Sequence, residues 1–403
     1  MSEQIRASRT EERPAGDAAD FLVTPDSDRR PTLSIVMPTL NEEVGVRECI
    51  DQIENALAEL EIPGEIIVSD SSDDRTPEIA AEYGAHVVEP DGMGYGYAYK
   101  YAFERARGDY VVIGDADTTY DFAKLPKLLA PVREGDADMV MGSRLAGEIR
   151  PGAMPSLHQY VGNPLLTKFL NVFYSAGVSD AHSGFRVIDS DVLDRLDLRS
   201  DGMEFASEMI MEASAQGFTI EEVPITYHPR EGEATLDSFR DGWRHVKFML
   251  INAPSHLFSI PGLVFSVLGV VTMAVALFDV QIGSASPGIN TMIAGSLLTI
   301  VGFQITTLAV FSSIAADPIQ RPSDSITGLI RNHFKLEHGA TLGLVLYGLG
   351  TIYVTFVVAR WATGGFDTAP FAVRSMVAFT AIVLGTQTIF SSFFFSMLAQ
   401  SKD

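Results

Sequence analysis

Four long apolar runs constrain the fold of this chain more than any other feature of its sequence. They cover about residues 257–280, 289–315, 341–362 and 371–399. Each exceeds the roughly 20 residues that a helix needs to cross a bilayer. Gln304 and Arg374 are the costly polar groups in or beside these runs, and helices of a water-soluble core rarely stay so apolar over this length. The sequence therefore predicts a transmembrane region of about four helices over residues 257–403.

The net charge lies ahead of these runs. The 403 residues carry 52 acidic and 29 basic side chains, a formal net charge of −23. Residues 257–403 contain six of each kind, so the whole acidic excess falls on residues 1–256. A strongly acidic surface argues against nucleic acid as a partner, because nucleic-acid binding needs a basic surface. The single cysteine, Cys49, excludes a disulfide framework and a cysteine zinc cluster.

Lysine is scarce, with 7 Lys against 22 Arg. An acidic, lysine-poor composition favours a protein that works in high salt, as in a halophilic archaeon, because counterions then screen the repulsion among its carboxylates. An ordinary acidic cytoplasmic domain is the alternative. Activity measured against KCl concentration separates the two interpretations.

The flanks of the apolar runs predict how the chain meets the membrane. Residues 1–30 are polar, lack the apolar core of a signal peptide and are expected to form a disordered tail. Residues 237–256 form an amphipathic juxtamembrane segment with Trp243 among basic residues, which suits a helix in the lipid headgroup layer better than a plain connector. The bias of basic residues places both termini and the acidic domain in the cytoplasm. These basic residues are Arg240, Arg244 and Lys247 before the first run and Arg321, Arg331 and Lys335 between the second and third.

Residues 31–236 alternate between strand and helix patterns. Short apolar runs predict strands at 33–37, 65–69, 86–88 and 110–113. Helical spacing follows at about 42–60, 76–83 and 96–107. This alternation predicts an α/β fold with a Rossmann-like, mainly parallel sheet and helices on both faces. Ligands of such sheets bind at the carboxyl ends of the strands.

Two carboxylates follow the fourth predicted strand directly. Asp115 and Asp117 are separated by one residue, and like charges this close favour a shared divalent cation. Mg²⁺ and Mn²⁺ accept a few carboxylates together with phosphate oxygens, so a diphosphate ligand fits this pair. A lone pair of this kind is common on acidic surfaces, but its place at a strand end favours the metal interpretation.

The other strand ends carry polar or glycine-rich segments as well. PTLNE at 38–42 follows the first strand, and DSSDDRT at 70–76 follows the second. The third is followed by DGMGYG at 91–96, whose glycines allow close approach of a ligand and whose position at a helix start favours an anion. Each segment alone is compatible with ordinary turn chemistry, but together they fall on one sheet edge.

An ordered set of motifs gives the chain a family resemblance. The set is PTLNEE at 38–43, VSDSS at 68–72, the glycine-rich helix start, DAD at 115–117, GSR at 142–144, DAHSGFR at 180–186 and EVPI at 222–225. Over about residues 31–250 the chain resembles the family-2 glycosyltransferases, within them the dolichyl-phosphate mannose and glucose synthases. The resemblance implies a GT-A fold and inverting transfer of one hexose from a nucleotide sugar to a dolichyl or polyprenyl phosphate.

The resemblance also implies roles for individual residues. The donor nucleotide sugar would be bordered by Pro38, Asn41, Glu42, Asp70, Gly94, Asp115, Ala116 and Asp117. Asp115 and Asp117, with Thr119 as a further ligand, would hold the Mg²⁺ or Mn²⁺. Arg144 and Arg230 would clamp phosphate during catalysis, since a guanidinium pairs with two oxygens at once. Ser183 and Arg186 would lie near the sugar or acceptor.

Glu208 and Glu204 form a separate hypothesis. They lie four residues apart on a predicted helix and could touch sugar hydroxyls, although a solvated face of an acidic protein explains them equally well.

A lipid monophosphate is largely ionised at pH 7, since phosphoesters lose their second proton near pH ~6. Its transfer therefore needs no strong general base, unlike transfer to a hydroxyl.

The chain departs from the family pattern at three places. Thr235 stands where a phosphate-facing Lys is expected, Thr119 where a Gln often follows the carboxylate pair, and His158 or Gln159 where an Arg is expected. These departures concern affinity, metal choice and donor more than the reaction class. GDP-mannose, UDP-glucose and other UDP-hexoses all stay open as donors.

Three alternatives remain from the sequence. A processive polysaccharide synthase would carry a Q-x-x-R-W motif, whereas Arg360-Trp361 is preceded by Val357 and lies in an apolar run. A transferase that extends a lipid-linked oligosaccharide would need a base for a hydroxyl acceptor. A lipid flippase or scaffold with a degenerate transferase domain is the non-enzymatic alternative, and the intact Asp115 and Asp117 argue against it. The transmembrane helices also allow a homo-oligomer.

Overall fold

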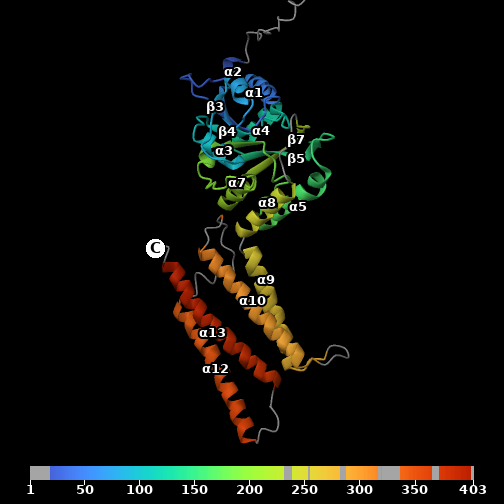
Figure 1. The fold of residues 1–403 in the computed structure, drawn as a ribbon, viewed down its shortest axis with the longest axis vertical. Helices are drawn as coiled ribbons and strands as arrows, with labels where there is room; N and C mark the ends of the chain where they lie inside the picture. Colours follow the sequence, from blue (N-terminus) through green and yellow to red (C-terminus); the bar gives the residue numbers. More distant parts are fainter. Residues whose placement is uncertain are drawn as a thin grey trace, which may run out of the picture. The chain divides into compact units, whose positions relative to one another are not determined.

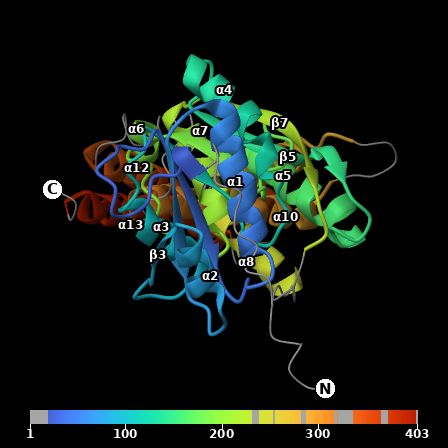
Figure 2. The same ribbon diagram turned by 90° about the horizontal axis from the view of Figure 1, so that it is seen from above.

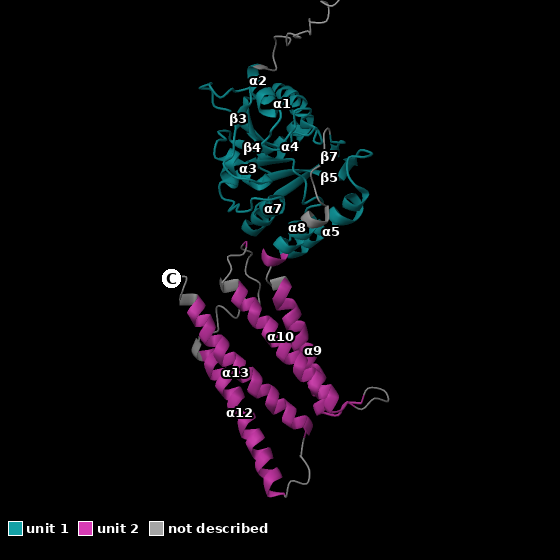
Figure 3. Cartoon of the chain, viewed as in Figure 1, with its two compact units in different colours: residues 1–249 teal, residues 250–403 magenta. Residues whose placement is uncertain are grey.

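The structure is a computed structural model that describes residues 19–230, 238–252, 255–281, 287–315, 319, 336–364 and 372–400. The chain divides into two compact units, unit 1 over residues 1–249 and unit 2 over residues 250–403 (Figure 3). The predicted interfacial segment spans the division. Its residues 238–252 form helix α8, and residues 231–237, including Thr235, lie outside the described residues.

Unit 1 is built on a seven-stranded sheet with the strand order β3-β2-β1-β4-β6-β5-β7 (Figure 1). Strand β6 runs antiparallel to both of its neighbours, and all the other pairs are parallel. The mainly parallel sheet predicted from the sequence is therefore confirmed. The strands are β1 Leu33–Thr39, β2 Gly64–Asp70, β3 His86–Val88, β4 Tyr110–Ile113, β5 Met139–Ile149, β6 Arg186–Asp189 and β7 Ile220–Tyr227.

Helices cover both faces of this sheet (Figure 2). On one face, α1 (Val46–Leu60) and α4 (Leu125–Glu134) share a core with alternate residues of β1 and β2. On the other, α3 (Tyr95–Phe103) packs on β1 and β2 and stacks Tyr99 on Phe205 of α7 (Phe205–Gln216). The shorter or more peripheral elements are η1 Ala19–Phe21, α2 Thr76–Glu82, η2 Phe122–Lys124, η3 His158–Gly162, α5 Asn163–Tyr174, α6 Ser190–Leu193, α8 Ser238–Asn252 and η4 Ser255–Ser259.

The part of the predicted tail that the structure describes is ordered. Val23 is buried, and its N–H donates to the Gly64 carbonyl at 2.8 Å. Arg30 pairs with Asp109 at 2.6 Å. The prediction of disorder is therefore wrong for residues 19–30, because one apolar side chain and a backbone hydrogen bond fasten them to the sheet. Residues 1–18 lie outside the described residues.

Within its described residues, unit 2 contains four helices long and apolar enough to cross a membrane. The candidate spans cover Leu257–Leu277, Ile289–Ser312, His338–Thr363 and Ala372–Leu398. They belong to the helices α9 Ile260–Leu277, α10 Ile289–Ala315, α12 Leu336–Thr363 and α13 Ala372–Gln400. The four apolar helices predicted from the sequence are thus confirmed. The basic loop residues Arg321, Arg331 and Lys335 lie outside the described residues.

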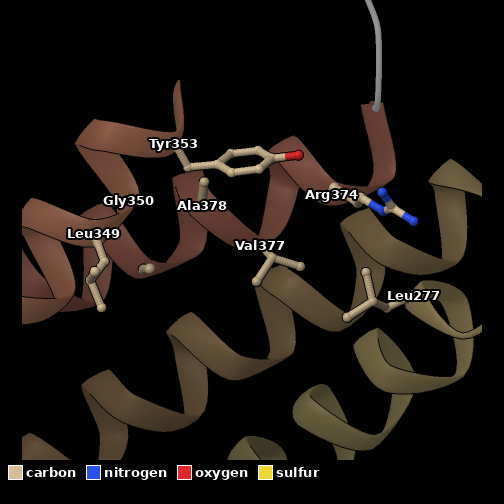
Figure 4. A pocket seen from close by; sticks show the side chains of 8 residues that line it. Leu277, Leu349, Gly350, Tyr353, Arg374, Val377 and Ala378 are labelled. Atoms are coloured by element: carbon tan, nitrogen blue, oxygen red, sulfur yellow. The ribbon is translucent and has the colours of Figure 1, made fainter. Parts of the chain in front are cut away.

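Glycines bring these helices together in pairs. A Cβ added at Gly269 of α9 would lie 2.4 Å from the Thr299 nitrogen of α10, and one at Gly385 of α13 would lie 2.6 Å from the Gly343 oxygen of α12. Such small residues let two helix backbones approach within a membrane. An apolar pocket lies among α9, α12 and α13, with Tyr353 and Arg374 as its polar lining (Figure 4).

Candidate functional site

The sheet topology brings distant segments of unit 1 to one edge. Strands β1, β2 and β4 are parallel, so the loops that follow them leave the sheet at the same edge. Because β6 is antiparallel to β4, the loop that precedes β6 reaches this edge too. The site is therefore built from residues 38–43, 70–76, 114–120 and 180–185, which are far apart in the sequence.

The loops after β1 and β2 interlock on the nucleotide side predicted from the sequence. Pro38 and Ser69 are register partners. The carboxylate of Asp70 accepts hydrogen bonds from the hydroxyls of Thr39 and Ser72, both at 2.6 Å. Asn41, whose φ is 60°, donates its N–H to Ser72 and accepts the Asp73 N–H at 3.0 Å. The structure therefore brings Pro38, Asn41 and Asp70 together, and their own hydrogen bonds hold this surface in shape.

Asp115 and Asp117 follow β4, as predicted, and have different surroundings. Asp115 is half-buried and accepts a hydrogen bond from the Tyr95 hydroxyl at 2.9 Å. Asp117 accepts the Thr119 N–H at 3.1 Å and its hydroxyl at 2.5 Å. Ala116 between them is buried. Thr119 thus orients Asp117 directly.

Arg230 connects this pair to Glu42. Its Nη2 forms an ion pair with the Glu42 carboxylate, and its Nη1 lies 3.5 Å from Asp117. Burial raises the pKa of Glu42 to about 7, opposed by Arg230 and supported by repulsion from Asp117 and Asp115. Burial, followed by repulsion from Asp117, raises the pKa of Asp115 to about 6. Arg230 thus contacts two of these three carboxylates, and an added positive charge would stabilise the ionised forms of all three.

The donor set at this edge fits a hard divalent cation. Carboxylate oxygens are the ligands that Mg²⁺ and Mn²⁺ prefer. Burial, followed by repulsion from Asp117, raises the pKa of Asp115, and a bound cation would oppose both effects. No group of three or more His, Cys, Asp or Glu side chains with metal-binding geometry occurs in the described part of the chain. Asp115 and Asp117 would therefore need oxygens from a bound ligand or water to complete the coordination.

Arg144 has a different arrangement from the one expected. Its Nε and Nη2 bind the two carboxylate oxygens of Asp180 at 2.7 and 2.9 Å, and its backbone N–H binds Asp180 at 3.0 Å. Both side chains are buried. The Arg144 guanidinium, which was expected to bind phosphate, thus binds a carboxylate instead. This is because Arg144 on β5 lies next to Asp180 in the loop that precedes β6. In this structure Arg144 fixes the loop.

Two N–H groups at the start of α3 are used within the protein. The Gly96 and Tyr97 N–H groups donate to the Asp201 carbonyl at 3.0 and 3.2 Å. Gly94, whose φ is 129°, packs so closely that an added Cβ would lie 2.1 Å from that carbonyl. These two N–H groups are therefore not available to an anion in this structure, and Gly94 allows the close contact between the start of α3 and the segment around Asp201.

The loop before β6 lies beside Asp115. A Cβ added at Gly184 would lie 3.1 Å from an Asp115 carboxylate oxygen, and the Gly184 N–H donates to the Tyr120 hydroxyl at 2.7 Å. Arg186 is fully buried and donates to the Ser183 and Ala181 carbonyls. Its Nη1 and the Ser183 hydroxyl have no hydrogen-bond partner within the described residues. The loop therefore reaches the carboxylate pair through Gly184, while the side chains of Ser183 and Arg186 are buried behind it.

Glu208 does not face a ligand. Its two carboxylate oxygens accept the N–H groups of Arg199 and Ser200 at 3.0 and 2.9 Å, and its side chain is buried. The hypothesis that Glu208 touches the sugar is therefore wrong for this structure, because the residue holds the loop that covers the start of α3. Glu204 precedes α7 as its N-cap residue.

Sequence reasoning missed three residues that build the site. Tyr95 and Tyr120 place hydroxyls beside Asp115 and Gly184, and Asp180 holds Arg144. Tyr120 lies three residues after Asp117 and Tyr95 lies in the glycine-rich segment, so their proximity to known motifs was a usable signal. The partner of Asp180 could not be read from the sequence, since it lies 36 residues away.

Comparison with protein families supports the fold and its membrane attachment. Residues 34–197 match the model described as glycosyl transferase family 2. Residues 314–399 match the model of the glycosyltransferase family 2 C-terminal transmembrane region. The two models therefore fall on the two units described above.

Similar proteins include two from Haloferax volcanii and one solved structure from Mycobacterium tuberculosis. The low-salt glycan biosynthesis hexosyltransferase Agl6 of Haloferax volcanii is 57% identical over 381 residues, which cover 94% of this chain and 92% of the relative. The dolichyl-phosphate hexose transferase of the same organism is 35% identical over 215 residues, covering 52% and 89% of the two chains. A Mycobacterium tuberculosis glucosyl-3-phosphoglycerate synthase, solved with Mn²⁺, UDP and phosphoglyceric acid, matches with a TM-score of 0.46, 25% identity and coverage of 55% and 78%.

Proposed function

Because the chain belongs to glycosyl transferase family 2, with a GT-A fold and a C-terminal membrane region, we propose that it transfers one hexose from a nucleotide sugar to a dolichyl or polyprenyl phosphate. The observation that carries the proposal is the Asp115 and Asp117 pair at the carboxyl end of β4, beside Arg230 and the loop that precedes β6. The 35% identical relative is named for dolichyl phosphate and a hexose, which supports the acceptor class.

The proposed reaction exchanges two bonds at the anomeric carbon of the sugar. The bond to the nucleotide diphosphate breaks, and a bond to an oxygen of the lipid phosphate forms with inversion. The acceptor is already largely ionised at pH 7, so the enzyme chiefly positions the reactants and stabilises the leaving diphosphate. Donors of the GDP-mannose and UDP-glucose type both suit this chemistry.

The residues of the site divide this work. Pro38, Asn41, Glu42 and Asp70 would border the nucleotide, and Asp115 and Asp117 would hold Mg²⁺ or Mn²⁺, with Thr119 orienting Asp117. When bound, the metal would supply positive charge to the diphosphate. Arg230 lies next to this pair and would contact phosphate as the charge develops. The loop around Gly184 would face the sugar or acceptor, while Arg144 would position this loop through Asp180.

The orientation in the membrane is part of the same proposal. Basic residues of the described chain gather before the first span, at Arg240, Arg244 and Lys247, and such residues favour the cytoplasmic side. Unit 1 and both termini would then face the cytoplasm, where nucleotide sugars are made. The described spans anchor unit 1 to the membrane that contains the acceptor.

The test is a panel of radiolabelled donors with a polyprenyl phosphate, Mg²⁺ or Mn²⁺, and the full chain in membranes. We expect labelled lipid from one donor, its loss on chelation and its return with added metal. Asp117→Ala should lower the rate on the order of 10²-fold or more, as when one electrostatic contact at a reacting charge is removed. Asp136→Ala, which changes an exposed carboxylate after α4, is the matched control. Labelled lipid from no donor would overturn the proposal.

A further inference from the structure

The glycine-rich segment that starts α3 directs a tyrosine hydroxyl at the carboxylate pair. Tyr95 is the first residue of α3, and its hydroxyl donates a hydrogen bond to the Asp115 carboxylate at 2.9 Å. The N–H groups of the next two residues, Gly96 and Tyr97, donate to the Asp201 carbonyl. These backbone hydrogen bonds fix the start of the helix, and they therefore fix the position from which the Tyr95 side chain extends.

Two further aromatic rings hold the ring of Tyr95. It packs edge-on against Tyr99, with ring centroids 5.0 Å apart and an interplanar angle of 83°. Tyr99 in turn stacks on Phe205 of α7, at 5.2 Å and 5°, and both of these side chains are buried. Edge-to-face and stacked pairs are favourable arrangements of aromatic rings. Because the hydroxyl oxygen of a tyrosine lies in the plane of its ring, this packing also fixes the Tyr95 hydroxyl.

The loop that precedes β6 holds the same carboxylate from its other side. A Cβ added at Gly184 would lie 3.1 Å from Asp115 Oδ2, 3.2 Å from the Tyr95 hydroxyl and 3.3 Å from the Tyr120 hydroxyl. The Gly184 N–H donates to the Tyr120 hydroxyl at 2.7 Å, which fixes the backbone at this point. Tyr95 therefore binds Oδ1 of Asp115, while the backbone of Gly184 lies beside Oδ2.

Each carboxylate of the pair thus has its own hydroxyl partner. Asp117 is bound by the Thr119 hydroxyl two residues along the chain, whereas Asp115 is bound by a hydroxyl 20 residues before it. Partners of this kind orient the groups that bind a metal, and the loss of one typically costs 10–100-fold in metal affinity or activity. The long-range contact from Tyr95 is therefore a candidate for the same task as the local contact from Thr119.

We propose that Tyr95 is a positioning residue of the metal site, whose hydroxyl holds the Asp115 carboxylate in the orientation that binds Mg²⁺ or Mn²⁺. The inference rests on the proposed function, because that function assigns the metal to Asp115 and Asp117. A carboxylate without this partner has to be ordered when the metal binds, which lowers affinity. Loss of the hydroxyl should therefore weaken metal binding and leave the rate at saturating metal nearly unchanged.

Direct measurement of Mn²⁺ binding tests this role. The full chain in detergent is titrated with Mn²⁺ and free Mn²⁺ is followed by electron paramagnetic resonance, with UDP and GDP in separate arms and no acceptor. Tyr95→Phe should raise the Mn²⁺ dissociation constant about 10-fold. Tyr101→Phe is the matched control and should leave the constant unchanged. It removes the same atom from the same helix six residues further on, where the ring packs against the Arg105 guanidinium at 3.6 Å.

A second variant disturbs the same contact while keeping the hydroxyl. Gly184→Ala would place a methyl group beside both Asp115 Oδ2 and the Tyr95 hydroxyl, so it should also weaken Mn²⁺ binding. Thermal midpoints show whether each variant is folded, and Gly184→Ala decides the matter if Tyr95→Phe is not. The rate of sugar transfer against Mn²⁺ concentration then separates a change in metal affinity from a change in kcat.

Unchanged Mn²⁺ affinity in Tyr95→Phe would overturn the proposal, and so would an equal loss in Tyr101→Phe. A higher KM for the donor at unchanged Mn²⁺ affinity would also overturn it and assign Tyr95 to the donor instead. Absence of Mn²⁺ binding by the unaltered chain with either nucleotide would refute this inference together with the metal site. If Tyr95→Phe weakens Mn²⁺ binding but no donor yields labelled lipid, the proposed reaction fails and the role of Tyr95 stands.

Discussion

Arg144 and Asp180 form a buried ion pair that ties β5 to the loop that precedes β6. Three hydrogen bonds join them, two from the guanidinium and one from the Arg144 backbone. The backbone N–H groups of Ser179 and Asp180 are in turn bound by Glu222 of β7, at 2.6 and 3.0 Å. The position of this loop therefore depends on charged residues from three separate segments.

Removing one partner of this pair should destabilise the protein. Asp180→Ala leaves the Arg144 guanidinium buried without its carboxylate, a change that typically costs about 3–5 kcal/mol. Chemical denaturation of the detergent-solubilised chain measures the loss. Asp109→Ala, which breaks the exposed pair with Arg30, is the control and should cost less than about 1 kcal/mol. Equal losses in the two variants would contradict the assigned role of the pair.

His182 should make stability depend on pH. Burial, and then repulsion from His245, holds its pKa well below the usual value, while Asp180 opposes this and Arg144 and Arg186 support it. The unfolded chain therefore binds a proton below about pH 6.5 that the folded chain does not bind. Stability should fall as the pH falls below that value, by up to about 1.4 kcal/mol per pH unit.

His182→Gln, which can keep the hydrogen bond to Ser207, should reduce this slope. The readout is the thermal midpoint of the solubilised chain across the acid range. His86→Gln on the edge strand β3 is the control and should leave the slope unchanged. An unchanged slope in His182→Gln would show that other groups cause the acid sensitivity.

Residue types at strand ends were predictable, but their partners were not. Asp115 and Asp117 were found because their position after an apolar strand is a local property of the sequence. Arg144 and Glu208 were misinterpreted because an arginine suits phosphate and carboxylate equally well, and a glutamate on a helix can cap a loop as readily as bind a ligand. Which partner is present depends on residues that only the folded chain brings close.

At the scale of elements, the first half of unit 1 follows from local patterns. Strands predicted at 33–37, 65–69, 86–88 and 110–113 are observed at Leu33–Thr39, Gly64–Asp70, His86–Val88 and Tyr110–Ile113. The antiparallel direction of β6 was not predicted, because strand direction follows from connections over long range. The exposure of Leu165 and Val172 on α5 was also missed, since apolar residues on a helix resemble core positions in the sequence.

Gly94 gives a test of the contact between the start of α3 and residues 199–202. Gly94→Ala adds a Cβ against the Asp201 carbonyl. The new alanine would also have to adopt a backbone conformation that favours glycine. We expect a loss of about 1–2 kcal/mol from backbone strain and a further loss of about 1–3 kcal/mol from overpacking. Gly135→Ala also has positive φ but meets open space, so it should show the strain alone. Denaturation midpoints that coincide would refute the contact.

The whole molecule combines an acidic unit with an apolar one, and salt should act mainly on the former. The Debye length falls from about 10 Å at 0.1 M salt to about 3 Å at 1 M, so repulsion among the carboxylates of unit 1 weakens. We expect both the thermal midpoint and the activity to rise with KCl up to molar concentration. Sucrose at equal osmolality, which adds no ions, is the control. Full activity without molar salt would contradict this prediction.

The antiparallel strand β6 also bears on how such molecules diverge. The parallel strands β1, β2 and β4 carry the loops that we propose bind the donor, whereas the segment between β5 and β6 includes α5 and the 180–185 loop. That segment begins and ends at neighbouring strands, so another segment that joins the same two strands could replace it. We expect a chimera that carries this segment from a relative to keep the donor preference and to change the acceptor preference, as a panel of lipid phosphates would measure. Exchange of this segment during evolution could then change the acceptor lipid that is glycosylated while the nucleotide sugar stays the same.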